Sequence, residues 1–247
     1  MNREEAVLRE LSLYPLWKLR EQVAPALSPS PSPACGRGVR DSAGEDEGLT
    51  EKSDKSREQL ISELGWPELK VMVRGCTACK LRTGCTQTAF GVGDEKADWL
   101  FVGEGPGADE DALGEPFVGQ AGKLLDNMLV AIKLKRGSNV YIANIVKCRP
   151  PGNRTPEADE IATCLPYLQK QIGLIQPKVI VALGKTAATT LLGREATLGS
   201  LRGKRHDYQG IPLIITYHPA YLLRTPSDKA KTWQDLCLAV ETMKGLN

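Results

Sequence analysis

Four of the seven cysteines in this chain are spaced in a way that could bind a metal. Cys76 and Cys79 form a C-x-x-C pair, and Cys148 and Cys164 could complete a four-thiolate site. Seven cysteines in a chain that shows no export signal favour a metal site or scattered core thiols over disulfides. Four thiolates suit zinc and an iron–sulfur cluster equally well, so the spacing leaves the metal open. The remaining cysteines are expected to be ordinary thiols: Cys35, Cys85 and Cys237.

A second group of candidate residues lies in four short segments, each of which follows an apolar run. If the runs are parallel strands, these segments meet at one edge of the sheet, where ligands bind in open parallel sheets. One of the two histidines, His218, lies in the last segment, whereas His206 lies in a basic turn and is expected to be a surface or structural residue. The four segments are GEGPGADED (103–111), KCRPPGNR (147–154), GKTA (184–187) and HPAYLLR (218–224).

Two of these segments resemble nucleotide-binding loops only in part. Residues 103–108 fit the dinucleotide fingerprint, but acidic residues crowd the position of a pyrophosphate, and the ribose-binding acid about 20 residues on is missing. Residues 184–186 (GKT) end like a P-loop, yet Val179 stands where its first glycine is needed. The sequence therefore argues against both kinds of nucleotide site.

The elements that would position these segments alternate between strand and helix. Apolar runs rich in β-branched residues predict strands that are buried on both faces. The predicted strands are Trp99–Val102, Val140–Val146, Val179–Leu183 and Leu213–Tyr217. Helical patterns lie between and after them, at 121–132, from 155 onwards, at 185–192 and at about 227–244. This alternation predicts an α/β domain whose parallel sheet is covered by helices on both faces.

The helix after the second strand carries its own signals. Thr155 is expected to be its N-cap, with Pro156 in the first turn. Pro166 is expected to kink the helix just after Cys164.

The N-terminal quarter of the chain has a different composition. Residues 1–24 predict a short amphipathic segment, and residues 25–60, rich in Pro, Ser and charge, predict a disordered linker before a domain over 61–247. The segment 1–24 either binds a protein partner or docks on its own domain.

Charge and hydropathy limit the class of protein only broadly. Residues 1–60 hold 9 Lys/Arg and 11 Asp/Glu, whereas the remainder holds 23 and 19, so the predicted domain is mildly basic. No apolar run nears the ~20 residues that span a bilayer, and the N-terminus lacks a signal-peptide pattern. We therefore expect no membrane association and a cytoplasmic location, nucleoid-associated if the chain is bacterial.

The motifs themselves resemble one family. GEGPGADED, EPFVGQAGKLLD, NIVKCRPPGNRTP and HPAYLLR occur here in the order and spacing of the family 4 uracil-DNA glycosylases, over roughly residues 66–240. The resemblance implies a three-layer α/β/α fold with a four-stranded parallel central sheet. It also implies a [4Fe–4S] cluster on Cys76, Cys79, Cys148 and Cys164. The acidic, Pro/Ser-rich stretch before the domain is a departure, because shorter family members lack it.

The resemblance further implies a reaction and the residues that perform it. The enzyme would be a monofunctional glycosylase, expected to be a monomer, that flips uracil out of DNA and hydrolyses its N-glycosidic bond, which starts base excision repair. Phe117 would stack on uracil, Asn144 would read its edge and His218 would donate to its oxygen, while Glu104 or Glu110 would orient water. The implied uracil-binding set is Glu104, Gly105, Pro106, Glu110, Phe117, Asn144 and His218.

The sequence also predicts which residues contact DNA. Arg149, Arg154 and Arg224 are expected to meet phosphates, and Leu222 is expected to be the wedge that fills the gap left by the flipped base. A non-catalytic iron–sulfur or zinc protein that binds nucleic acid as a scaffold remains the alternative.

Overall fold

A six-stranded sheet forms the centre of the computed structural model, which describes residues 56–246. The strand order is β1-β3-β2-β4-β6-β5. The four inner strands run parallel: β2 (Trp99–Gly103), β3 (Val140–Asn144), β4 (Val179–Leu183) and β6 (Ile211–Thr216). These are the four strands that the sequence predicts, with ends that differ by up to two residues.

Two short antiparallel strands extend the sheet at its edges, so the sheet is mixed rather than purely parallel. They are β1 (Val92–Gly93), which pairs with β3, and β5 (Arg205–Tyr208), which pairs with β6. The sequence did not predict them, because β1 has only two residues and three of the four side chains in β5 are not buried. An edge strand of this kind lacks the apolar run that marks an inner strand.

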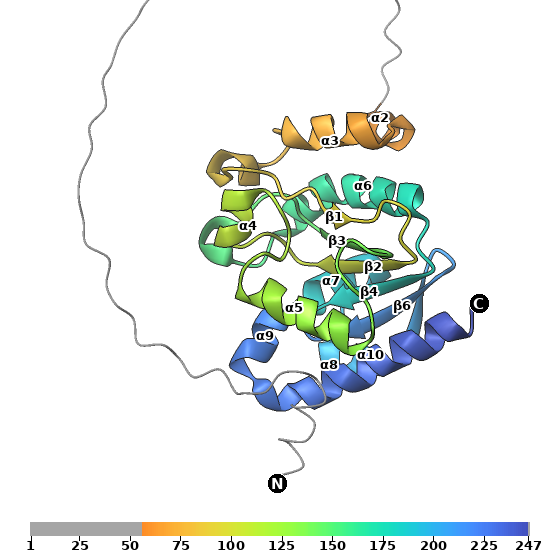
Figure 1. Ribbon diagram of the computed structural model, residues 1–247. Helices are drawn as coiled ribbons and strands as arrows, with labels where there is room; N and C mark the ends of the chain where they lie inside the picture. Colours follow the sequence, from red (N-terminus) through yellow and green to blue (C-terminus); the bar gives the residue numbers. More distant parts are fainter. Residues whose placement is uncertain (1–55, 247) are drawn as a thin grey trace, which may run out of the picture.

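Helices cover both faces of the sheet, and strand side chains alternate between two hydrophobic clusters (Figure 1). On one face Leu100 and Ile180 pack with α2 (Arg57–Glu63), α3 (Trp66–Arg74), α6 (Ala158–Ile175), α7 (Lys185–Leu192) and α8 (Leu198–Leu201). On the other face Phe101 and Val181 pack with α5 (Gln120–Ala131), α9 (Pro219–Arg224) and α10 (Lys229–Lys244). The remaining elements are α4 (Ala108–Leu113), η1 (Lys80–Gly84), η2 (Pro151–Asn153) and η3 (Pro226–Asp228).

Helix α6 differs from the sequence expectation at its N-terminus. Its N-cap is Glu157 rather than Thr155, and the Glu160 carboxylate accepts a hydrogen bond from the Glu157 amide (2.7 Å). The helix contains Pro166 and continues through it to Ile175, and a kink at this point stays a prediction. The carbonyl that Pro166 cannot bond belongs to Ala162, an exposed residue, so water can satisfy it.

The first described helix begins earlier than the predicted domain. The expected segment 1–24 and most of the linker 25–60 lie outside the described residues, but residues 57–60 form the first turn of α2. Ser56 caps this turn, Ile61 is buried in the core, and Arg57 donates from Nη1 to the Thr163 carbonyl (2.8 Å). These contacts order the end of a stretch whose composition alone suggested a linker.

Within residues 56–246, no helix has the length and apolar character needed to cross a bilayer.

The carboxyl ends of the four parallel strands lie along one edge of the sheet. The end of β6 is fixed by the buried Asp235 of α10, which accepts hydrogen bonds from Thr216 Oγ1 (2.9 Å) and from two nitrogens of Arg202 (3.0 and 3.1 Å). Because Thr216 lies two residues before His218, this network also fixes where the chain leaves the sheet towards His218.

Candidate active site

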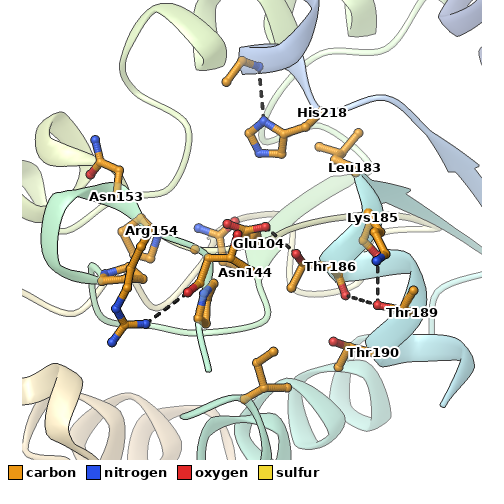
Figure 2. A pocket seen from close by; sticks show the side chains of 18 of the residues that line it. Glu104, Asn144, Asn153, Arg154, Leu183, Lys185, Thr186, Thr189, Thr190 and His218 are labelled. Atoms are coloured by element: carbon orange, nitrogen blue, oxygen red, sulfur yellow. Dashed lines mark hydrogen bonds between the residues drawn. The ribbon is translucent and has the colours of Figure 1, made fainter. Parts of the chain in front are cut away.

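A cleft of about 990 Å³ lies at this edge of the sheet, and all four segments that follow the parallel strands contribute to its wall. Figure 2 shows Glu104, Asn144 and His218 around the same space, with Thr186 of α7 beside Glu104. The seven residues expected to bind uracil all line this cleft: Glu104, Gly105, Pro106, Glu110, Phe117, Asn144 and His218.

Asn144 ends β3 and is 1% exposed. Its Oδ1 is fully buried, yet it accepts no hydrogen bond from any of residues 56–246. An unpaired buried polar atom costs about 1–3 kcal/mol, so this oxygen is a strong candidate to meet a ligand. Gly103 lies opposite in the β2–β3 register, and a Cβ there would come within 2.4 Å of Asn144 Oδ1. A glycine at position 103 is therefore required for Asn144 to occupy this position.

Phe117 forms another part of the wall from an unusual backbone conformation. Its φ is 56°, a left-handed value that is uncommon for a bulky residue. Arg136 holds this loop, because Nη2 donates to the Phe117 carbonyl (2.7 Å) and Nη1 to the Pro116 carbonyl (3.0 Å). The Phe117 ring lies 5.5 Å from the His218 ring, between centroids, with the two planes 30° apart. The two rings therefore bound one compact part of the cleft.

Glu110 holds the same loop from the other side. Its Oε1 accepts from the amides of Val118 (2.9 Å) and Gly119 (3.0 Å), and its Oε2 accepts from the amide of Gly107 (3.0 Å). Three backbone donors thus occupy this carboxylate, which joins the start of α4 to the Phe117 loop.

Glu104, directly after β2, has a different environment. Its Oε2 accepts a hydrogen bond from the hydroxyl of Thr186, and Oε1 accepts none from the described part of the chain. The side chain is half-buried in the cleft. Of the two candidate acids, Glu104 is the one with an oxygen still available to a water molecule.

His218 is the N-cap of α9, and its Nδ1 accepts a hydrogen bond from the Ala220 amide (3.2 Å). Because Nδ1 is the acceptor, a neutral ring carries its proton on Nε2. Burial lowers the pKa of His218 to about 4, nearby Arg224 acts in the same direction, and Glu110 opposes them. At neutral pH the ring is therefore an uncharged donor through Nε2.

The four residues expected to contact DNA differ in their placement. Arg224 is exposed and lines the cleft. Arg154 also lines the cleft, but both its Nη atoms bond the buried Glu160 carboxylate (2.6 and 2.8 Å), so its charge is already paired. Arg149 donates from Nε to Asn153 Oδ1 (2.8 Å).

Leu222, the residue predicted to be the wedge, is buried in this structure. It is 1% exposed and packs in the core beneath α9, so it could reach DNA only by leaving that core. The next residue, Leu223, is 45% exposed on the same short helix.

The first turn of α7 is also part of the cleft, although none of its residues was predicted to bind or react. Lys185 and Thr186 line the wall there, and Lys185 forms an ion pair with Glu195 (3.3 Å). The position of GKTA after a predicted strand was a signal that it belongs at this edge. Its failure as a P-loop did not exclude it from a different site.

The four candidate metal-binding cysteines line a second, much smaller cavity beneath α2 and η1. Cys164 Sγ accepts from the Lys147 amide (3.3 Å), and Arg57 Nη2 lies 4.0 Å from Cys76 Sγ. Within residues 56–246, no three His, Cys, Asp or Glu side chains are close enough together to hold a single metal ion.

Comparison with known proteins agrees with this geometry. The model of the uracil DNA glycosylase superfamily matches residues 90–237. A type-4 uracil-DNA glycosylase from Pyrobaculum aerophilum is 43% identical over 181 residues, which are 69% of this chain and 91% of the relative. One from Thermotoga maritima is 45% identical over 161 residues, which are 64% of this chain and 83% of the relative. The chain belongs to the type-4 uracil-DNA glycosylases.

A more distant relative shows how far this likeness extends. A type-5 uracil-DNA glycosylase from Thermus thermophilus is 31% identical over 147 residues, 52% of this chain and 67% of the relative. The type-4 sequences are thus clearly more similar to this chain than this type-5 sequence is.

The first prediction concerns His218 in this type-4 glycosylase. We expect NMR titration of His206→Gln, which leaves a single histidine, to show an imidazole midpoint near pH 4 rather than 6.5. Between these values the unfolded chain binds more protons than the folded one, so the contribution of His218 to stability should increase with pH across this window. A midpoint near 6.5 would show that the ring is not desolvated as described.

Proposed function

We propose that this chain removes uracil from DNA by hydrolysing the bond between the base and deoxyribose, the first step of base excision repair. The observation that carries the proposal is the buried, unpaired Oδ1 of Asn144 at the cleft wall. An enzyme that acts on a base must take it out of the duplex into a pocket, and that pocket must offer partners to its polar edge.

Asn144 supplies the chemistry that distinguishes uracil from cytosine. Uracil presents a donor at N3 and an acceptor at O4, whereas cytosine presents an acceptor at N3 and a donor at N4. The Asn144 amide can accept from N3–H through Oδ1 and donate to O4 through Nδ2. Cytosine would leave buried polar groups unpaired, and this is the strongest way for a site to reject an analogue.

Phe117 would stack on the flipped base. Base–aromatic stacking contributes about 1–3 kcal/mol, and flipping costs a few kcal/mol, so the stack recovers part of that cost. The positive φ of Phe117 and the Arg136 bonds to its loop support a ring that is held in place before DNA binds.

His218 would stabilise the departing base. As the glycosidic bond breaks, negative charge develops on the oxygens of uracil, and a fixed donor at such an oxygen lowers the barrier. The proton on Nε2, the depressed pKa and the nearby Phe117 ring support a neutral His218 in this role.

Glu104 would orient the attacking water and favour the cationic sugar. We prefer it to Glu110, because the Glu110 carboxylate already serves three backbone amides and Glu104 keeps one oxygen available. Glu110 would then act indirectly, by holding the Phe117 loop.

The four cysteines Cys76, Cys79, Cys148 and Cys164 would hold a [4Fe–4S] cluster. Arg57 and Lys147 bring positive charge to the same cavity, which favours an anionic thiolate cluster over four neutral thiols. When bound, the cluster would join η1, the end of β3 and α6, so we assign it a structural role.

Contacts to DNA would come from the rim of the cleft. Arg224 and Arg149 would meet phosphates, and Leu223 rather than Leu222 would enter the duplex as the wedge. Arg154 would add less, because Glu160 neutralises its charge.

The second prediction tests base choice. On matched single-uracil and single-cytosine oligonucleotides, Asn144→Asp should lower the single-turnover rate for uracil strongly and raise cytosine excision to a measurable level. A carboxylate only accepts hydrogen bonds, so it loses uracil O4 and gains the cytosine amino group. Asn153→Asp, at the rim of the same cleft, is the control and should keep the wild-type preference.

Full-rate uracil excision by Asn144→Asp would show that Asn144 does not read the base. Absence of alkali-sensitive sites with the unaltered protein would favour the scaffold alternative.

The third prediction concerns the cluster. Protein purified without oxygen should be brown and contain about four irons per chain. Cys148→Ala should lose the colour and unfold at a lower temperature, whereas Cys237→Ala, on α10, should retain both iron and stability. Stoichiometric zinc without iron in the anaerobic protein would contradict the cluster.

The fourth prediction separates the two leucines of α9. Leu223→Ala should slow excision from duplex DNA more than from single strands and leave unfolding unchanged, because a wedge acts only in a stacked duplex. Leu222→Ala should instead reduce the free energy of unfolding by about 2–5 kcal/mol, as expected for a buried leucine. Wild-type duplex excision by Leu223→Ala would rule out the wedge.

A further inference from the structure

The contact between Glu104 and Thr186 joins two parts of the chain that are 82 residues apart in sequence. Thr186 lies in the first turn of α7, and its Oγ1 donates to Glu104 Oε2. Figure 2 shows the two side chains next to each other and joined by this hydrogen bond. Both are half-buried, so water competes only in part for this hydrogen bond.

The first turn of α7 is itself held firmly against the site. Gly184, its N-cap, has a φ of 95° and donates from its amide to the Thr216 carbonyl at the end of β6 (2.9 Å). A Cβ on Gly184 would lie 3.0 Å from His218 Cβ. The donor to Glu104 is therefore built on backbone that also abuts His218.

The direction of the Thr186 hydroxyl differs from that of Thr189 in the same helix. Thr189 Oγ1 bonds back to the Lys185 carbonyl (3.1 Å), which is the usual local partner of a helical threonine. Thr186 bonds a carboxylate on another element instead. The buried residues of α7 are Ala187, Ala188, Thr189 and Leu191, whereas Thr186 is only half-buried.

We propose that Thr186 is a positioning residue for Glu104. By occupying Oε2, its hydroxyl fixes the rotation of the carboxylate and directs Oε1 towards the attacking water. A fixed near-attack geometry is a large part of what a catalytic site contributes, and a displacement of about 1 Å can cost about 100-fold in rate. This inference rests on the proposed role of Glu104 as the residue that orients water.

The fifth prediction tests this role with the hydroxyl as the only variable. Thr186→Val removes the hydroxyl at nearly constant volume and should lower the single-turnover rate of uracil excision about 10- to 100-fold, in keeping with the loss of a hydrogen bond to a charged group. The affinity for uracil-containing DNA should stay within about twofold, because the effect falls on the chemical step. Thr186→Ser should retain the wild-type rate within about threefold, and Thr186→Ala should match Thr186→Val. Thr190→Val, one turn further along α7, is the control and should behave as wild type.

Combination with Glu104→Ala distinguishes this inference from the function on which it rests. If Thr186 acts through Glu104, adding Thr186→Val to Glu104→Ala should lower the rate no further. Effects that multiply in the double variant would overturn the inference, as would a full rate for Thr186→Val when Glu104→Ala is slow. A full rate for Glu104→Ala would instead refute the proposed role of Glu104. Failure of Thr186→Ser to restore the rate would likewise count against the hydroxyl.

Discussion

The close approach of Asn144 and Phe117 over Gly103 is the contact on which the cleft depends. The β2–β3 register places Gly103 beside Asn144, and a Cβ at position 103 would lie 2.4 Å from Asn144 Oδ1 and 2.5 Å from Phe117 Cζ. Neither neighbour can yield easily, because both are buried and the Phe117 backbone is held in a left-handed conformation. The bare backbone of one glycine thus allows an aromatic face and an amide edge to share one small space.

The charged residues around this space differ in what they bond. Arg136 and Glu110 hold the Phe117 loop from two sides through its carbonyls and amides, so their charges stabilise structure. Glu104 receives a single side-chain donor, Thr186. The two glutamates differ in whether a carboxylate oxygen remains free to accept a hydrogen bond. A carboxylate whose oxygens already accept from fixed backbone amides can hold the chain in place but cannot orient a water molecule.

Lys147 connects this cleft to the cysteine-lined cavity. Its side chain is buried, and Nζ donates to the Asn144 carbonyl (2.9 Å) and to Gln171 Oε1 (2.7 Å), while its amide donates to Cys164 Sγ. Burial lowers the pKa of Lys147 to about 8. The same residue thus contacts both the strand end that carries Asn144 and one of the four cysteines. A cluster bound to these cysteines would affect the cleft by making this segment rigid.

The sequence by itself determined the parallel strands, the edge at which they end and the residues gathered there. These features follow from local information: a buried inner strand must be apolar along its length, and the chemistry-bearing motifs come directly after the strands.

Tertiary packing decided the rest. Leu222 and Leu223 are adjacent in sequence, and only the docking of α9 determines which of them is buried. The threonine that bonds Glu104 lies 82 residues further along the chain, so the local sequence does not predict this contact. The contact exists because the paired strands β2 and β4 bring the segments that follow them to one edge of the sheet.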